Sequence, residues 1–295
     1  RLQLFCSDQI SNMKAITFGD ITSKVGNFKL PSASKNEDVT PYIQGKPLVS
    51  ADSIVLYSAS QRANKGRKRH KNTGQTASIY LSQKLGGKQV GTLAHTIAVK
   101  NGVAFYQSIP NLTKNTTVPL LRETVPTNAP LFTDEGYKYL WGYYPNHRQV
   151  NHSKKSEDKR YRWARDRFCH NGIHNQVAEG NQAVLKIAFR AYSYINPKYS
   201  QLYLNEFSFF KNLGIIGYDR LIEYKENLGN SNLKSENNTQ SKASKPAISG
   251  TSQMSSVVRK GKKKLNFIIK LIIILCVFSD FPTFSILFIK MFRTD

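Results

Sequence analysis

Three carboxylates occupy positions in this chain where acids could take part in catalysis. Asp52 lies inside a strand-like apolar run, Asp134 directly follows another such run, and Glu179 lies in an amphipathic helical stretch. Acids on separate elements can converge at one edge of a sheet, and Mg²⁺ prefers oxygen ligands of this kind. Two such cations can activate the attacking oxygen and stabilise the leaving one at a phosphodiester. The simpler alternative is three unrelated surface acids, since an Asp close to a glycine turn needs no chemistry to explain it.

A further group of polar residues surrounds Glu179 in the stretch HNQVAEGNQAVLK (174–186). Asn175 and Glu179 are four residues apart, and Glu179 and Lys186 are seven apart, so a helix projects all three to nearly one side. This spacing is typical of a solvated helix face, but it also places an amide, a carboxylate and an ammonium together. By itself the stretch favours a solvated helix face. Whether it forms part of a functional site depends on the other elements of the chain.

The elements that would position these residues alternate between strands and helices. A β-branched, apolar run predicts a strand over 47–58, and Asn101-Gly102 predicts a hairpin between two further strands. Hydrophobic periodicity then predicts, in chain order, a short helix, a short buried strand and two helices, over 117–125, 129–137, 175–194 and 201–212. This order predicts an α/β fold with a mixed sheet and flanking helices.

The charge of the chain favours a polyanionic partner. Its 295 residues carry 43 Lys+Arg against 19 Asp+Glu, a formal net charge of +24. Nucleic acid is the first candidate and an anionic membrane surface the second, while a lysine-rich genome would give a similar composition without any function.

Two basic segments carry much of this charge. The segment 61–75 is too polar to bury, and includes Arg67, Lys68 and Arg69. Around 159–167, aromatic and basic side chains interleave, a mixture that serves both phosphate neutralisation and base stacking. Its members include Arg160, Arg162, Trp163 and Arg165. A charged helix face with its aromatics anchored in the core explains the second segment equally well.

The cysteines and the first residue limit other interpretations. Cys6, Cys169 and Cys276 are far apart and form no CxxC pair, so neither a disulfide framework nor a zinc ribbon is indicated, and we expect a reducing compartment. The chain opens on Arg1 without a signal-peptide pattern, so we expect an incomplete N-terminus.

Four regions follow from composition. We expect a remnant or loosely packed lead-in over 1–45, a catalytic domain over 46–226, a polar disordered linker over 227–258, and a basic and hydrophobic tail over 259–295. A membrane-spanning helix needs ~20 apolar residues. Lys270 and Asp280 interrupt the tail, so a re-entrant or interfacial segment, or an out-of-frame extension, is favoured over a spanning one.

The order of elements and several local motifs resemble the RNase H-like catalytic domain of DDE insertion-sequence transposases, in the subgroup related to Merlin DNA transposons. The resemblance covers about 46–212. Its most specific pieces are TDEGY around Asp134, QVNHSKK (149–155), HNQVAEG (174–180) followed by Leu185-Lys186, and YLNEFSFFKN (203–212).

This resemblance implies an activity and roles for particular residues. Asp52, Asp134 and Glu179 correspond to a catalytic triad that binds two Mg²⁺ or Mn²⁺ ions, and Lys186 to the residue that holds transposon-end DNA. His174 and Asn175 correspond to the motif before the glutamate. The implied partners are terminal inverted repeats and target DNA, bound by a homodimer or larger assembly in a prokaryotic nucleoid and cytoplasm, or in a eukaryotic nucleus.

The chain departs from the family pattern beside two of the acids. Asn181 and Gln182 replace an aromatic pair after Glu179, Ser53 replaces an acidic neighbour of Asp52, and a threonine is missing between His174 and Asn175. A relative that binds DNA without cutting it is therefore the second interpretation, and a membrane-anchored basic protein without nuclease ancestry is the third.

Overall fold

The computed structural model describes residues 2–35, 37–59, 78–151 and 169–228. All of them belong to a compact unit over Arg1–Lys234. The expected hydrophobic tail and nearly all of the expected linker lie outside these ranges, as do both basic segments. Within the described ranges, no helix combines the length and apolar character needed to cross a bilayer.

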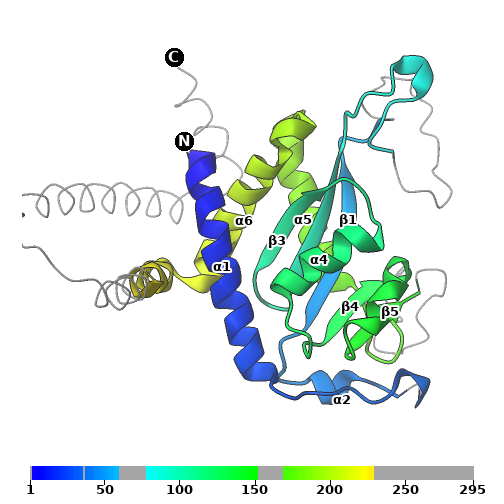
Figure 1. The fold of residues 1–295 in the computed structure, drawn as a ribbon, viewed down its shortest axis with the longest axis vertical. Helices are drawn as coiled ribbons and strands as arrows, with labels where there is room; N and C mark the ends of the chain where they lie inside the picture. The colour runs from blue at the N-terminus through cyan, green and yellow to red at the C-terminus, as the bar shows by residue number, and fades with distance from the viewer. Residues whose placement is uncertain (1, 36, 60–77, 152–168, 229–295) are drawn as a thin grey trace, which may run out of the picture. The chain divides into compact units, whose positions relative to one another are not determined.

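A mixed five-stranded sheet, in the order β3-β2-β1-β4-β5, forms the centre of the fold (Figure 1). β1, β2 and β3 form an antiparallel meander, whereas β4 pairs parallel to β1 and β5 parallel to β4. The strands are β1 (Val49–Leu56), β2 (Thr92–Val99), β3 (Ala104–Ile109), β4 (Leu131–Asp134) and β5 (His147–Val150). The α/β prediction, the first four strands and the hairpin are confirmed. Only β5 was not predicted, because four residues in an aromatic and basic stretch carry too little periodicity.

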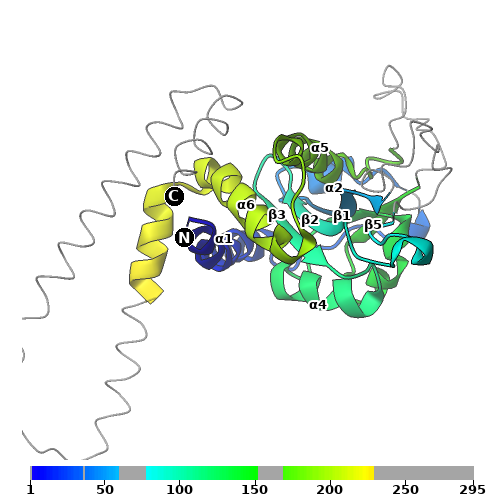
Figure 2. The same ribbon diagram turned by 90° about the horizontal axis from the view of Figure 1, so that it is seen from above.

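Helices cover both faces of this sheet. Seen from above, α4 and α5 lie on opposite faces, and α6 runs along the side of β3 (Figure 2). The helices are α1 (Leu2–Val25), α2 (Thr40–Ile43), α4 (Lys114–Thr124), α5 (Gln176–Ala191) and α6 (Ser200–Ile216), and residues 218–228 are also helical. The three predicted helices correspond to α4, α5 and α6.

The expectation of a loosely packed lead-in over 1–45 is wrong for its first half. The 24-residue helix α1 packs against α6 and α4 and contributes buried residues such as Met13 and Ile21 to the main core. Its apolar residues are not confined to one stripe, so helical periodicity gave no clear signal.

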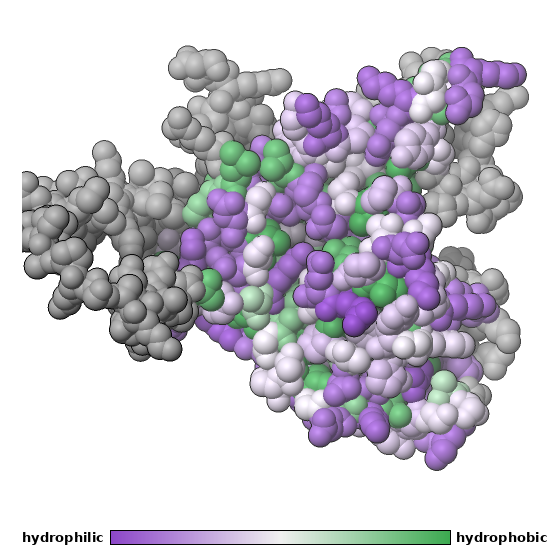
Figure 3. All heavy atoms as spheres, in the orientation of Figure 1, coloured by the Kyte–Doolittle hydropathy of each residue, from purple (hydrophilic) through white to green (hydrophobic). Residues whose placement is uncertain are grey.

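On the face drawn in Figure 3, hydrophilic residues alternate with small apolar patches.

The core is divided by the sheet, and this division orients β1. Val49 and Ala51 pack with α1 and α4 on one face, whereas Ile54 and Leu56 pack with Leu185 of α5 on the other. Because successive strand residues point to opposite faces, Asp52 lies on the α5 face and Ser53 on the α4 face.

Candidate active site

The pairing of β1 with β4 brings the two aspartates to the same level. Val49 is opposite Leu131 and Ser50 is opposite Phe132, and extending this parallel register by two residues places Asp52 level with Asp134. Asp134 ends β4, and its Oδ1 accepts a hydrogen bond from the Gly136 N–H (3.1 Å) at the start of the 3₁₀ segment η3 (Glu135–Gly142). The sheet therefore places two carboxylates on neighbouring strands where β4 ends.

Glu179 joins these aspartates from the first turn of α5. Burial raises the pKa of Asp52 from 3.8 to about 7, with further raising by the negative charge of Asp134 and then that of Glu179. The Ser53 N–H, which donates to Asp52 Oδ1 (2.7 Å), and the Gln182 side chain lower this pKa. Asp134 and Glu179 thus both lie close enough to Asp52 for their charges to act on its pKa. Among the described residues, no basic side chain acts on the pKa of Asp52.

The side chains suit a divalent cation in charge and donor type but not in arrangement. Carboxylate oxygens are the ligands that Mg²⁺ prefers, and a cation would relieve the repulsion that raises the pKa of Asp52. As the side chains stand, however, no three His, Cys, Asp or Glu residues within the described ranges are close enough to hold one metal ion. Charge and donor type therefore favour a divalent cation, whereas the spacing of these side chains does not form a metal-binding group.

Buried amides lie around the first turns of α5, close to the acids. Asn175 is 1 % exposed, and neither polar atom of its side chain has a hydrogen-bond partner among the described residues. Gln182 is also buried; it acts on the pKa of Asp52, yet its Nε2 has no partner within hydrogen-bond distance. An amide therefore faces Asp52 at the position where the resemblance leads us to expect an aromatic ring.

The helix face predicted from the spacing of Asn175, Glu179 and Lys186 is only partly solvated. Asn175 is buried just before the helix, whereas Glu179 and Lys186 are exposed. His174 is half-buried, and its ring packs edge-on against Phe132 with 6.3 Å between ring centroids. Lys186 is thus available to an external anion, and His174 is packed beside β4.

A buried hydrogen-bond network on the opposite face of β1 was not found from the sequence. Ser53 Oγ lies 2.8 Å from both His95 Nδ1 and Tyr137 Oη, and these two atoms are 3.1 Å apart. His95 is fully buried, which lowers its pKa to about 4 and keeps the ring neutral at pH 7. Burial raises the pKa of Tyr137 well above its ordinary value, so the phenol remains protonated.

This network ties together the segments that carry the aspartates. Ser53 is the neighbour of Asp52, and Tyr137 lies three residues after Asp134. The only signals in the sequence were a serine beside the first acid and a tyrosine in TDEGY. The position of His95 opposite Ser53 depends on strand register.

The predicted DNA-binding residues in the two basic segments lie outside the described ranges. They are Arg67, Lys68, Arg69, Arg160, Arg162, Trp163 and Arg165. Their roles stay predictions.

One comparison with known proteins bears on these residues. The family model for the ISXO2-like transposase domain matches residues 42–212, which include all three acids, Lys186 and the whole sheet. No curated protein and no solved structure matches the chain.

Proposed function

Because the chain belongs to the ISXO2-like transposase domain family, a family of DDE insertion-sequence transposases, we propose that it cuts DNA at transposon ends and joins the freed 3′-OH to target DNA. The observation that supports this proposal is that β4 and α5 bring Asp134 and Glu179 close enough to Asp52 on β1 for both charges to raise its pKa. A domain family establishes the class of protein, and the coupled acids suggest where the chemistry takes place.

Each acid has a role in this proposal. Asp52 and Asp134 are held by the sheet, whereas Glu179 comes from a helix packed on it, so the two kinds of support fix the carboxylates from different sides. A divalent cation held by these residues would polarise the phosphodiester and lower the pKa of an attacking water. The desolvated position of Asp52 strengthens its interaction with any cation, since charges interact more strongly away from bulk water.

DNA would be held by positive side chains around these acids. Lys186 is exposed on α5 seven residues after Glu179, and we assign it a phosphate contact. We propose that the two basic segments extend this contact. His174 is half-buried and Asn175 is buried, so these two residues would reach DNA only if the turn before α5 opened. Binding should weaken steeply with salt, because phosphate contacts release counterions. Two Mg²⁺ or Mn²⁺ ions, a dimer or larger assembly on DNA, and a location in the nucleoid or nucleus are parts of the same proposal.

Nicking of supercoiled plasmid in Mg²⁺ or Mn²⁺ tests the proposal without knowledge of the terminal repeats. Asp134→Asn and Glu179→Gln should abolish nicking and retain DNA binding. Glu135→Gln is the matched control, because Glu135 neighbours Asp134 but is not among the groups that shift the pKa of Asp52. Nicking by Glu179→Gln at the unmutated rate would show that the site has been wrongly assigned.

A further inference from the structure

Two adjoining hollows lie at the start of β1, outside the group of acids. Their volumes are about 340 and 360 Å³. Both are lined by Gly45, Lys46, Lys100 and Asn101, so they form one continuous depression, which we call the β1-entry hollow. Its walls come from α1, α2, the loop before β1, the β2–β3 turn and the end of α6.

The β1-entry hollow carries an excess of positive charge. The described residues that line it include four basic side chains, Lys24, Lys46, Lys100 and Arg220, and one acidic side chain, Asp20. Asp20 is engaged by Arg220 through two hydrogen bonds of 2.6 and 2.8 Å. This pairing leaves the three lysines as the excess charge of the hollow, and all three are exposed.

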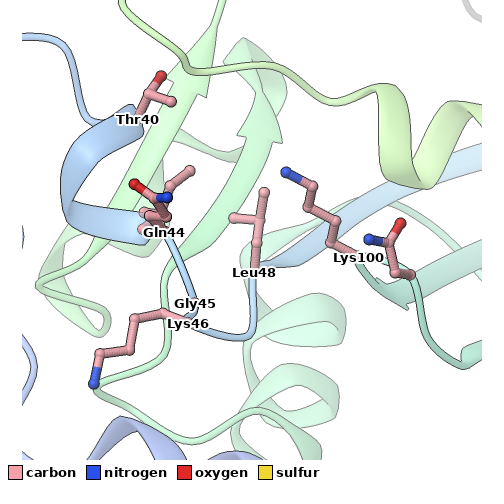
Figure 4. A pocket seen from close by; sticks show the side chains of 8 residues that line it. Thr40, Gln44, Gly45, Lys46, Leu48 and Lys100 are labelled. Carbon is pink, nitrogen blue, oxygen red and sulfur yellow. The ribbon is translucent and has the colours of Figure 1, made fainter.

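The lysines are partly positioned before any ligand arrives. Lys46 Nζ donates a hydrogen bond to the Lys24 carbonyl (3.3 Å) and lies 6.0 Å from the centroid of the Phe28 ring. The Lys100 N–H donates to the Leu48 carbonyl (2.9 Å), which fixes the β2–β3 turn against the loop that carries Lys46. In Figure 4, Lys46 and Lys100 lie on either side of Leu48 with their ammonium groups pointing in different directions, and Thr40 and Gln44 lie above Lys46.

The lining chemistry selects a phosphate backbone over unpaired bases. Proteins that bind single strands stack bases on aromatic rings. The residues described as lining the hollow include no aromatic side chain, and instead offer ammonium, amide and hydroxyl donors. Such donors position the sugar–phosphate backbone of a duplex without reading its sequence.

The hollow lies within reach of a duplex bound at the acids. Lys46 precedes Asp52 by six residues, which span at most about 20 Å of extended chain. Duplex DNA carries one charge per about 1.7 Å of its axis, so phosphates several base pairs from the cut fall within this distance.

We propose that the β1-entry hollow is a second DNA contact, in which Lys46 and Lys100 bind backbone phosphates of the duplex flanking the cut. The inference rests on the proposed function for the location of the cut, but its test measures binding alone. The hollow would add affinity and hold the duplex in register, without taking part in the chemistry at Asp52.

The test compares two double variants of the full chain. Lys46→Gln/Lys100→Gln removes two charges from the hollow. Lys84→Gln/Lys88→Gln removes two charges from exposed lysines that do not line it. Duplex affinity is measured by fluorescence anisotropy over a range of salt concentrations, and thermal unfolding by circular dichroism confirms that both variants fold.

The expected result is a change in salt dependence that is specific to the hollow. Each lost phosphate contact reduces the magnitude of the slope of log K against log salt by ~0.9. The slope of the hollow variant should therefore be about 2 smaller in magnitude, and that of the control variant should be almost unchanged. Equal slopes for the two folded variants would overturn the inference, whatever the plasmid assay shows. If the hollow variant shows the reduced salt slope but the unmutated protein does not nick plasmid, the inference about the hollow is supported and the proposed function is refuted.

Discussion

Asp52→Asn should stabilise the folded protein and at the same time abolish cleavage. The pKa of Asp52 rises from 3.8 to about 7 because the half-buried carboxylate is largely removed from water and lies near two other acids. Asparagine has nearly the same shape, keeps an oxygen that can accept from the Ser53 N–H, and removes the charge. Stability and activity should therefore change in opposite directions.

The size and sign follow from proton linkage. Between about pH 4 and pH 7 the unfolded chain releases the Asp52 proton, whereas the folded chain retains it. The folded state binds more protons, so the free energy of unfolding falls as pH rises, by about 1.4 kcal/mol per pH unit. Over the interval from 3.8 to about 7 the loss is about 4 kcal/mol, fully expressed only above the folded-state pKa.

Urea denaturation followed by circular dichroism, without divalent cations, measures this effect. The variant and the unmutated protein should have similar stability near pH 4, and the variant should be more stable by a few kcal/mol at pH 8. Glu135→Gln serves as the control and should leave the pH dependence unchanged. If the difference in stability between Asp52→Asn and the unmutated protein is no larger at pH 8 than at pH 4, the assignment of a desolvated, repelled carboxylate is wrong.

Further outcomes follow from the same contacts. Asp134→Asn should lower the pKa of Asp52, because the Asp134 charge is the second-largest cause of its rise. The loss of stability with rising pH should then end at a lower pH and be smaller in free energy. Adding Mg²⁺ at pH 8 should raise the melting temperature of the unmutated protein but not of Asp134→Asn, and an equal rise in both would argue against metal binding by these acids. Tyr137→Phe removes the phenol from the buried Ser53–His95 network and should cost about 1–3 kcal/mol in urea denaturation. Gly172→Ala should destabilise the fold, because Gly172 has φ +78° and a Cβ there would collide with Thr40 Oγ1; an unchanged melting temperature would contradict this packing of the turn before α5.

The elements that carry the acids were accessible from the sequence because their signals are local. Apolar runs mark β1 and β4, an Asn-Gly dipeptide marks the β2–β3 hairpin, and the amphipathic pattern after Asn175 marks α5. The identity of the acids came from the resemblance of short motifs around them. None of these signals depends on contacts with distant parts of the chain.

The remaining features depend on how distant segments meet, which only the tertiary structure decides. The raised pKa of Asp52 arises from burial under α5 and from charges 82 and 127 residues away along the chain, at Asp134 and Glu179. The network through His95 depends on strand register, and α1 packs against α6, which lies near the other end of the described chain. Local patterns thus predicted the elements that carry the acids, whereas burial, long-range contacts and charge determined what their side chains can do.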